Sequence, residues 1–198
     1  MSKPYYALVF LLLFSLLSFA GCEDDGCDDP SPDRQLDAAV LNAVPHFDGQ
    51  RLTYLVSDGT QFSVAFRGGL RPPLEEFGCT EQLLLDFEGG NARHRLSGQF
   101  DASPDPPNLA DIFVLLQVNG VPQNTLQIEL FGSGQITAGN NATARVIPEF
   151  TREGATYRNV LEQVYPDASP GQVERAYYST ERGLLGIFLV GGVEMWQQ

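Results

Sequence analysis

LTYLVSDGTQFSVAF, residues 52–66, is the stretch of sequence that decides the fold class. Apolar residues alternate with polar or smaller ones on both sides of the Asp58-Gly59 pair: Leu52, Tyr54 and Val56 before it, and Phe62, Val64 and Phe66 after it. Because successive side chains of a strand point to opposite faces, this period of two predicts strands with one face in the core. An Asp-Gly pair between two such runs indicates a β-hairpin.

The same period of two recurs along the rest of the chain. Further alternating runs cover 82–88, 95–100 and 126–130, and the C-terminus is expected to form a hairpin of 173–179 with 184–190, closed by 193–196. We count eight to ten short strands, which predicts an all-β fold with an antiparallel sheet, as a sandwich or a half-open barrel. At most one short helix is expected, over 36–44, ending at Pro45.

Three segments depart from simple alternation. Residues 112–118 are apolar on both faces, which predicts a central strand or one whose second face lines an apolar cavity. Residues 157–165 fit a helical or a strand pattern, and their β-rich composition favours a strand. We expect Arg71-Pro72-Pro73 to interrupt a strand, because proline has no N–H for the ladder.

The N-terminus has the pattern of a signal peptide. Lys3 precedes an uncharged apolar run, 5–20, that is shorter than the roughly 20 apolar residues of a membrane-spanning helix. An uncleaved N-terminal anchor is the alternative. Ala20-Gly21-Cys22 resembles the lipobox of bacterial lipoproteins, although Phe19 stands where leucine is usual. That resemblance implies cleavage after residue 21 and attachment of acyl chains such as palmitate through Cys22.

An acidic segment follows the predicted lipidation site. It contains Glu23, Asp24, Asp25, Asp28 and Asp29. Such a run repels itself and buries nothing, so we expect residues 22–35 to form a solvated tether before a single β-rich domain, 36–198. The run also resembles the acidic export signal of Bacteroidetes-type lipoproteins. This resemblance implies a lipid-anchored protein of the bacterial outer membrane, with exposure at the cell surface left open.

Charge and cysteine content narrow the choice of partners. The net charge is -13 and Lys3 is the only lysine, so nucleic acid, whose phosphates would be repelled, is not expected as a partner.

With Cys22 assigned to lipid, Cys27 and Cys79 remain, and an even remainder outside the cytoplasm predicts a disulfide. Two free thiols are the alternative, and no zinc site is expected.

The C-terminal hairpin carries a second resemblance. Residues 177–188, with Trp196 near the end, resemble the closing hairpin of small uncharacterised Bacteroidetes-type cell-envelope lipoproteins, and 157–161 are similar to a strand of the same proteins. The resemblance implies a location in the cell envelope and a β-fold but no activity. Tyr177, Tyr178 and Trp196 are candidates to face a ligand, since such rings combine a flat apolar face with a polar tip. A place in the core is the alternative.

The inventory of reactive side chains is thin. His46 and His94 have no serine or cysteine nucleophile at a telling distance and are expected to be solvated or capping residues. Asp86 and Glu88 would share a strand face, but solvent-facing acids are typical of any acidic protein. We therefore expect no catalytic residue, metal or cofactor.

Two functions remain open at this point. The first is a non-enzymatic module that is attached to the membrane by its lipid and contacts another envelope protein or a glycan. The alternative is a half-open barrel that carries an apolar ligand, a lipid or the acyl chains of lipoproteins. An enzyme lacks residues to support it.

Overall fold

The structure is a computed structural model, and it describes residues 27, 34–74, 79–104, 110–131, 135–138 and 143–198. The predicted signal peptide and Cys22 lie outside the described residues, as does the tether apart from residues 27, 34 and 35. Within the described ranges no helix is long and apolar enough to cross a membrane.

One helix and thirteen strands make up the described fold. They are α2 (Ala38–Ala43), β1 (Arg51–Val56), β2 (Gln61–Leu74), β3 (Thr80–Gly90), β4 (Arg95–Ser103), β5 (Ala110–Val118), β6 (Val121–Pro122), β7 (Leu126–Phe131), β8 (Gln135–Thr137), β9 (Ala144–Arg152), β10 (Ala155–Val164), β11 (Val173–Ser179), β12 (Gly183–Leu189) and β13 (Glu194–Gln197). The fold class is confirmed. The predicted helix is present as α2, inside the expected range 36–44 and before Pro45.

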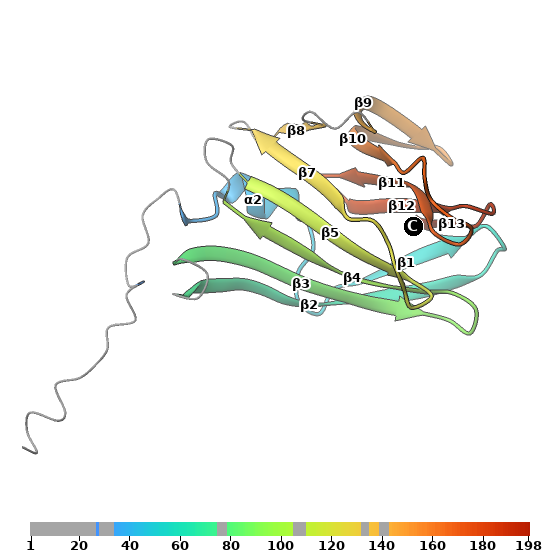
Figure 1. Cartoon of the computed structure of the whole chain (residues 1–198), viewed down its shortest axis with the longest axis horizontal. Helices are drawn as coiled ribbons and strands as arrows, with labels where there is room; N and C mark the ends of the chain where they lie inside the picture. Colours follow the sequence, from blue (N-terminus) through green and yellow to red (C-terminus); the bar gives the residue numbers. More distant parts are fainter. Residues whose placement is uncertain (1–26, 28–33, 75–78, 105–109, 132–134, 139–142) are drawn as a thin grey trace, which may run out of the picture.

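All strands belong to one antiparallel sheet that curls into a nearly closed barrel (Figure 1). The strand order is β8-β7-β5-β4-β3-β2-β1-β13-β12-β11-β10-β9, and β6 pairs with β5 outside this path. Neighbouring strands of this path therefore follow one another along the chain, except that β13 pairs with β1 and β5 pairs with β7. The two ends of the path, β8 and β9, come into contact, which leaves a seam between them.

The inward-facing side chains form one continuous core. Its largest fully buried members are Tyr54, Phe66, Phe100, Tyr178, Leu85, Leu96, Ile112, Leu126, Ile128, Leu130, Leu161 and Leu184. Helix α2 covers one end of the barrel, where the Tyr178 hydroxyl donates to the Ala43 carbonyl. Asp37 caps this helix by accepting from the Ala39 N–H at 2.7 Å.

The structure corrects two strand predictions. More strands exist than expected, because pieces as short as β6 and β8 carry too few residues for a period of two to be detected. The segment Arg71-Pro72-Pro73 does not end its strand, since β2 continues to Leu74. The register there jumps from Arg71, opposite Gln82, to Leu74, opposite Thr80, so the two prolines fall in an irregularity where the ladder needs no N–H.

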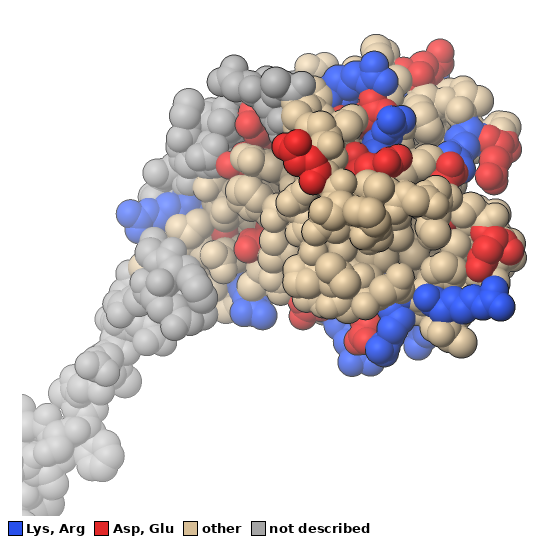
Figure 2. All heavy atoms as spheres, turned by 45° about the vertical axis from the view of Figure 1, so that its right-hand side comes forward, with Lys and Arg blue, Asp and Glu red and all other residues tan. Residues whose placement is uncertain are grey.

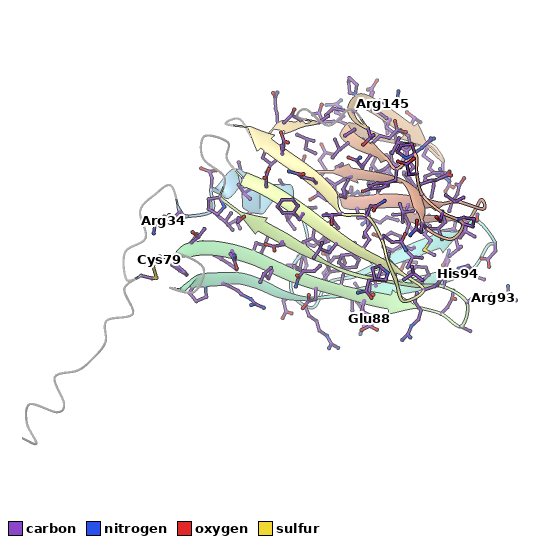
Figure 3. All side chains as sticks on the ribbon, viewed as in Figure 1. Arg34, Cys79, Glu88, Arg93, His94 and Arg145 are labelled. Carbon is purple, nitrogen blue, oxygen red and sulfur yellow. A yellow bond between two sulfur atoms is a disulfide. The ribbon has the colours of Figure 1, made fainter. Side chains whose placement is uncertain are left out.

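The predicted disulfide is present in the structure. Cys27 and Cys79 are joined, with their Cα atoms 5.2 Å apart, and Cys27 is buried. Cys79 directly precedes the first residue of β3. The bond therefore connects the segment before α2 to one end of the barrel, the end that α2 also covers (Figures 1 and 3).

Candidate functional site

An open groove of about 1320 Å³ lies on the outer face of strands β1 to β5. Two rows of cross-strand neighbours build it. One row is Arg51, Ala65, Glu88, Ser97 and Gln117, and the other is Arg67, Asp86, Gln99 and Leu115. Since residues opposite each other on paired strands point to the same face, these side chains all project outward together.

Side-chain size explains why this face is hollow. The floor is made by small residues, Ser63, Ala65, Gly90 and Ser97, which come from three neighbouring strands. Long polar side chains surround them, with Arg51 and Arg67 on one side and Gln117 on the other. A strip of small residues between long ones leaves a channel, because no side chain of the described residues fills the space above the floor. The hollow is larger than the 300–1,000 Å³ of most small-molecule pockets.

The groove carries both signs of charge. Asp86 accepts a hydrogen bond from Gln99 Nε2 at 2.7 Å, and Glu88 lies 3.8 Å from Arg95. The Arg95 and Glu88 side chains are 73% and 76% exposed, so their mutual attraction contributes little to stability. Three arginines against two carboxylates leave a small positive excess in a strongly acidic protein. These groups remain accessible to a partner.

A hydrogen-bonded cluster lies where β3 and β4 meet the β1–β2 turn. His94 Nε2 is 3.1 Å from Asp58 Oδ2, and Asp58 Oδ1 accepts from the Thr60 hydroxyl and N–H. The bonds from Thr60 and then from His94 hold the pKa of Asp58 below its usual range. Figure 3 places His94 and Arg93 at the barrel end opposite Cys79. The cluster braces two turns at the groove's edge.

His46 is not the solvated residue that the sequence suggested. It is 8% exposed, and its ring stacks on Phe66 at 4.3 Å and lies 5.3 Å from Phe100. Burial lowers its pKa to about 4, against the opposing effect of the hydrogen bond with Gln50. Proline at position 45 gave no sign that the next side chain turns inward.

The three aromatic candidates are buried in two different places. Tyr178 is fully buried in the barrel core. Tyr177 and Trp196, 5% and 3% exposed, lie on the outer face in a second apolar group, which we call the outer aromatic cluster. Its other members are Val160, Leu185, Ile147, Phe150, Tyr157 and Phe188. None of the three rings has an open face for a ligand, so the groove is a better candidate site.

A second, smaller hollow of about 370 Å³ lies beside Glu162. Glu162 is 2% exposed; it accepts from the Tyr177 hydroxyl at 2.7 Å and from Arg145, and Arg175 is 3.6 Å away. Burial alone would raise the pKa of Glu162, but these hydrogen bonds and the two positive charges outweigh it and lower the pKa. The carboxylate is satisfied by the chain itself, which indicates a structural role.

Neither hollow has the residues of a metal centre. Within the described ranges no group of three or more histidine, cysteine, aspartate or glutamate side chains is placed to hold an ion. On the face shown in Figure 2, arginines lie beside acidic side chains and do not gather into a patch of one sign. The arrangement suits hydrogen bonding to a polar partner of mixed character.

The groove could not be recognised from the sequence alone. Its residues are individually ordinary, and the small floor residues come together only through the register of three strands. Comparisons with protein-family models, with curated proteins and with solved structures found no match to this chain.

Proposed function

We propose that this protein is a lipid-anchored, non-enzymatic binding module of the bacterial cell envelope, held to the outer membrane through Cys22. The anchor rests on the sequence: a charged start, an apolar run and the small residues before Cys22. One acyl chain alone binds a membrane only weakly, whereas two or three bind firmly, because each buried CH₂ contributes about 0.8 kcal/mol.

The observation that supports binding is the open polar groove on β1 to β5. Its volume of about 1320 Å³ suits a segment of a polymer better than a metabolite. Serine, glutamine, arginine and carboxylate groups line it, and these can pair with the hydroxyls of a glycan or with the polar groups of an envelope protein. Arg51 and Arg67 make no ion pair among those described and are suited to a carboxylate on that partner.

The experiment that tests this proposal fills the groove. Ala65→Trp places a large ring on its floor, and Ala155→Trp introduces the same ring at an exposed position of β10 as the control. We expect proteins or glycans captured from envelope extracts by the native protein to be retained by the Ala155 variant and lost by the Ala65 variant. Equal capture by both variants would remove the groove from the proposal.

The anchor is tested separately. Cys22→Ser should leave an unprocessed precursor that incorporates no labelled palmitate. Normal processing of this variant would contradict lipidation at Cys22 while leaving the groove experiment unaffected.

The carrier of an apolar ligand stays as a second candidate because the barrel is nearly closed. Its inner face is filled by the core, however, and of the two apolar residues on the outer face of β5, Phe113 and Leu115, the second borders the polar groove. Solvent extraction of the purified protein followed by mass spectrometry distinguishes the two, since a stoichiometric lipid would favour the carrier.

A further inference from the structure

Two contacts of described residues tie the chain before α2 to the barrel. The Cys27–Cys79 disulfide fixes it beside the first residue of β3, and the Leu36 N–H donates to Glu81 Oε2 at 2.9 Å. Leu36 is itself 7% exposed and belongs to the barrel core. Both attachments therefore lie at the same end of the barrel, the end that α2 covers (Figure 1).

The disulfide shortens the connection between the lipid site and the barrel. From Cys22 to Cys27 a fully extended chain spans at most about 18 Å, at 3.3–3.6 Å per residue. Up to the Leu36 N–H, which donates to Glu81, the extended chain from Cys22 would instead reach about 50 Å. A barrel on the short connection keeps one end close to the lipid, whereas a barrel on the long connection would be free to turn.

The groove begins well away from this attachment. Strand β3 runs from Thr80, next to Cys79, to Gly90, and the nearest groove residue on it is Asp86. At about 3.3 Å per residue, Asp86 lies roughly 20 Å beyond Thr80, and Gly90 roughly 33 Å. Figure 3 shows the same arrangement, with Cys79 at one end of the sheet and Glu88 and His94 toward the other.

We propose that the Cys27–Cys79 disulfide holds the β3-start end of the barrel against the membrane, so that the groove faces away from it, toward a partner outside that membrane. This inference rests on the proposed lipid anchor at Cys22. The acids at 23–25, 28 and 29 support it, because anionic headgroups repel them and disfavour a barrel that lies flat on the surface.

The test uses the absence of lysine from the predicted mature chain. Arg71→Lys introduces a single side-chain amine near the attached end, where Arg71 pairs with Gln82, and Arg93→Lys introduces one at the far end. Arg71 is exposed and the Arg93 side chain is 74% exposed, so both amines accept a fluorophore. The full-length lipidated protein is reconstituted in phosphatidylcholine–phosphatidylglycerol vesicles that carry a short-range quencher on lipid headgroups. The unsubstituted protein corrects for label on the Cys22 α-amine.

We expect several-fold stronger quenching of the label at residue 71 than of the label at residue 93. A flexible insertion of about ten Gly and Ser residues after Cys22 lengthens the connection without touching the disulfide, and it should bring the two values together. Equal quenching in the protein without the insertion, or stronger quenching at residue 93, would overturn the orientation. Mass spectrometry of the mature chain separates this failure from that of the anchor, because an unlipidated Cys22 would overturn both.

Discussion

The outer face of β1 to β5 and the outer face of β11 to β13 belong to the same barrel, but the first is open to solvent and the second is covered by another part of the chain. The first carries small residues in its middle and stays open as the groove. The second is covered by the chain's own β9–β10 hairpin, whose Phe150 lies 5.0 Å from Tyr177 and 5.7 Å from Trp196. An outer face that the chain covers serves stability, and one that it leaves hollow is available to a partner.

Two backbone features make the covering possible. Asn159 in β10 and Glu153 at the tip of the hairpin both adopt positive φ, 49° and 51°. Such values in residues other than glycine mark local bends. Asn159 lies just before Leu161, where the pairing of β10 with β11 begins, and Glu153 forms the turn at the hairpin's tip. The part of the hairpin beyond this pairing packs on Trp196, with Tyr157 at 6.4 Å from that ring.

The largest expected difference between the two faces follows from truncating an apolar side chain on each. Trp196→Ala removes a ring that is 3% exposed and should lower the free energy of unfolding by about 4 kcal/mol. Leu115→Ala in the groove, where the side chain is 43% exposed, should cost about 1 kcal/mol or less. Urea unfolding measures both. Similar losses would mean that the outer aromatic cluster is not a second core.

A substitution at Gly186, whose backbone lies against the Trp196 ring, tests the packing of that ring. Gly186 lies opposite Trp196, and a Cβ added there would overlap the indole. Gly186→Ala should therefore displace the ring and cost about 3 kcal/mol, the upper range for overpacking. Gly69→Ala is the matched control, because Gly69 also lies in a strand and has no atom within 4 Å of the added carbon. Trp196 fluorescence should shift in the first variant and stay unchanged in the second.

Much of this architecture can be predicted from the sequence, since a period of two marks each strand that has one buried face. The Asp58-Gly59 hairpin, the short helix and the C-terminal hairpin follow from local patterns that need no partner. The disulfide follows from the count of cysteines. Each of these features depends on residues that are close in sequence or on chemistry that has few alternatives.

The candidate site could not be predicted in the same way. Tyr177 and Tyr178 are neighbours of the same type, yet one packs outside the barrel and the other inside it. Which ring faces where depends on the register with β12, which shifts between these two residues. The groove likewise depends on Ala65 lying opposite Glu88 and Glu88 opposite Ser97. Register is a property of paired strands and is not encoded in either strand alone.

A buried titratable group, His46, lies in the barrel core between these two faces. The pKa of His46 is lowered to about 4, so the unfolded chain, with a pKa near 6.5, takes up a proton first as the pH falls. The stability that the neutral ring contributes is fully present above pH 6.5 and should decline by about 2 kcal/mol between pH 7 and pH 4.5. His46→Leu should flatten this part of the curve, whatever its effect at neutral pH. An unchanged slope would show that another group titrates there.

The smallest expected difference in stability is between substitutions of two outward-facing arginines, one on each face. The guanidinium of Arg152 lies 4.5 Å above Trp196 and 5.2 Å above Phe188, and it pairs with Glu194. It is 25% exposed, so Arg152→Gln should lose cation–π and ion-pair energy of about 1 kcal/mol. Arg67→Gln on the groove face should change stability by less than about 0.5 kcal/mol, since exposed side chains away from packed contacts contribute little. Unfolding measured at low and at high salt separates the two contributions, because the ion pair is screened and the ring contact persists. If Arg67→Gln leaves the stability unchanged but weakens capture of a partner, then the groove face contributes to binding. The face that carries the outer aromatic cluster would then contribute to stability. If Arg67→Gln destabilises as much as Arg152→Gln, the groove is instead part of the protein's own packing.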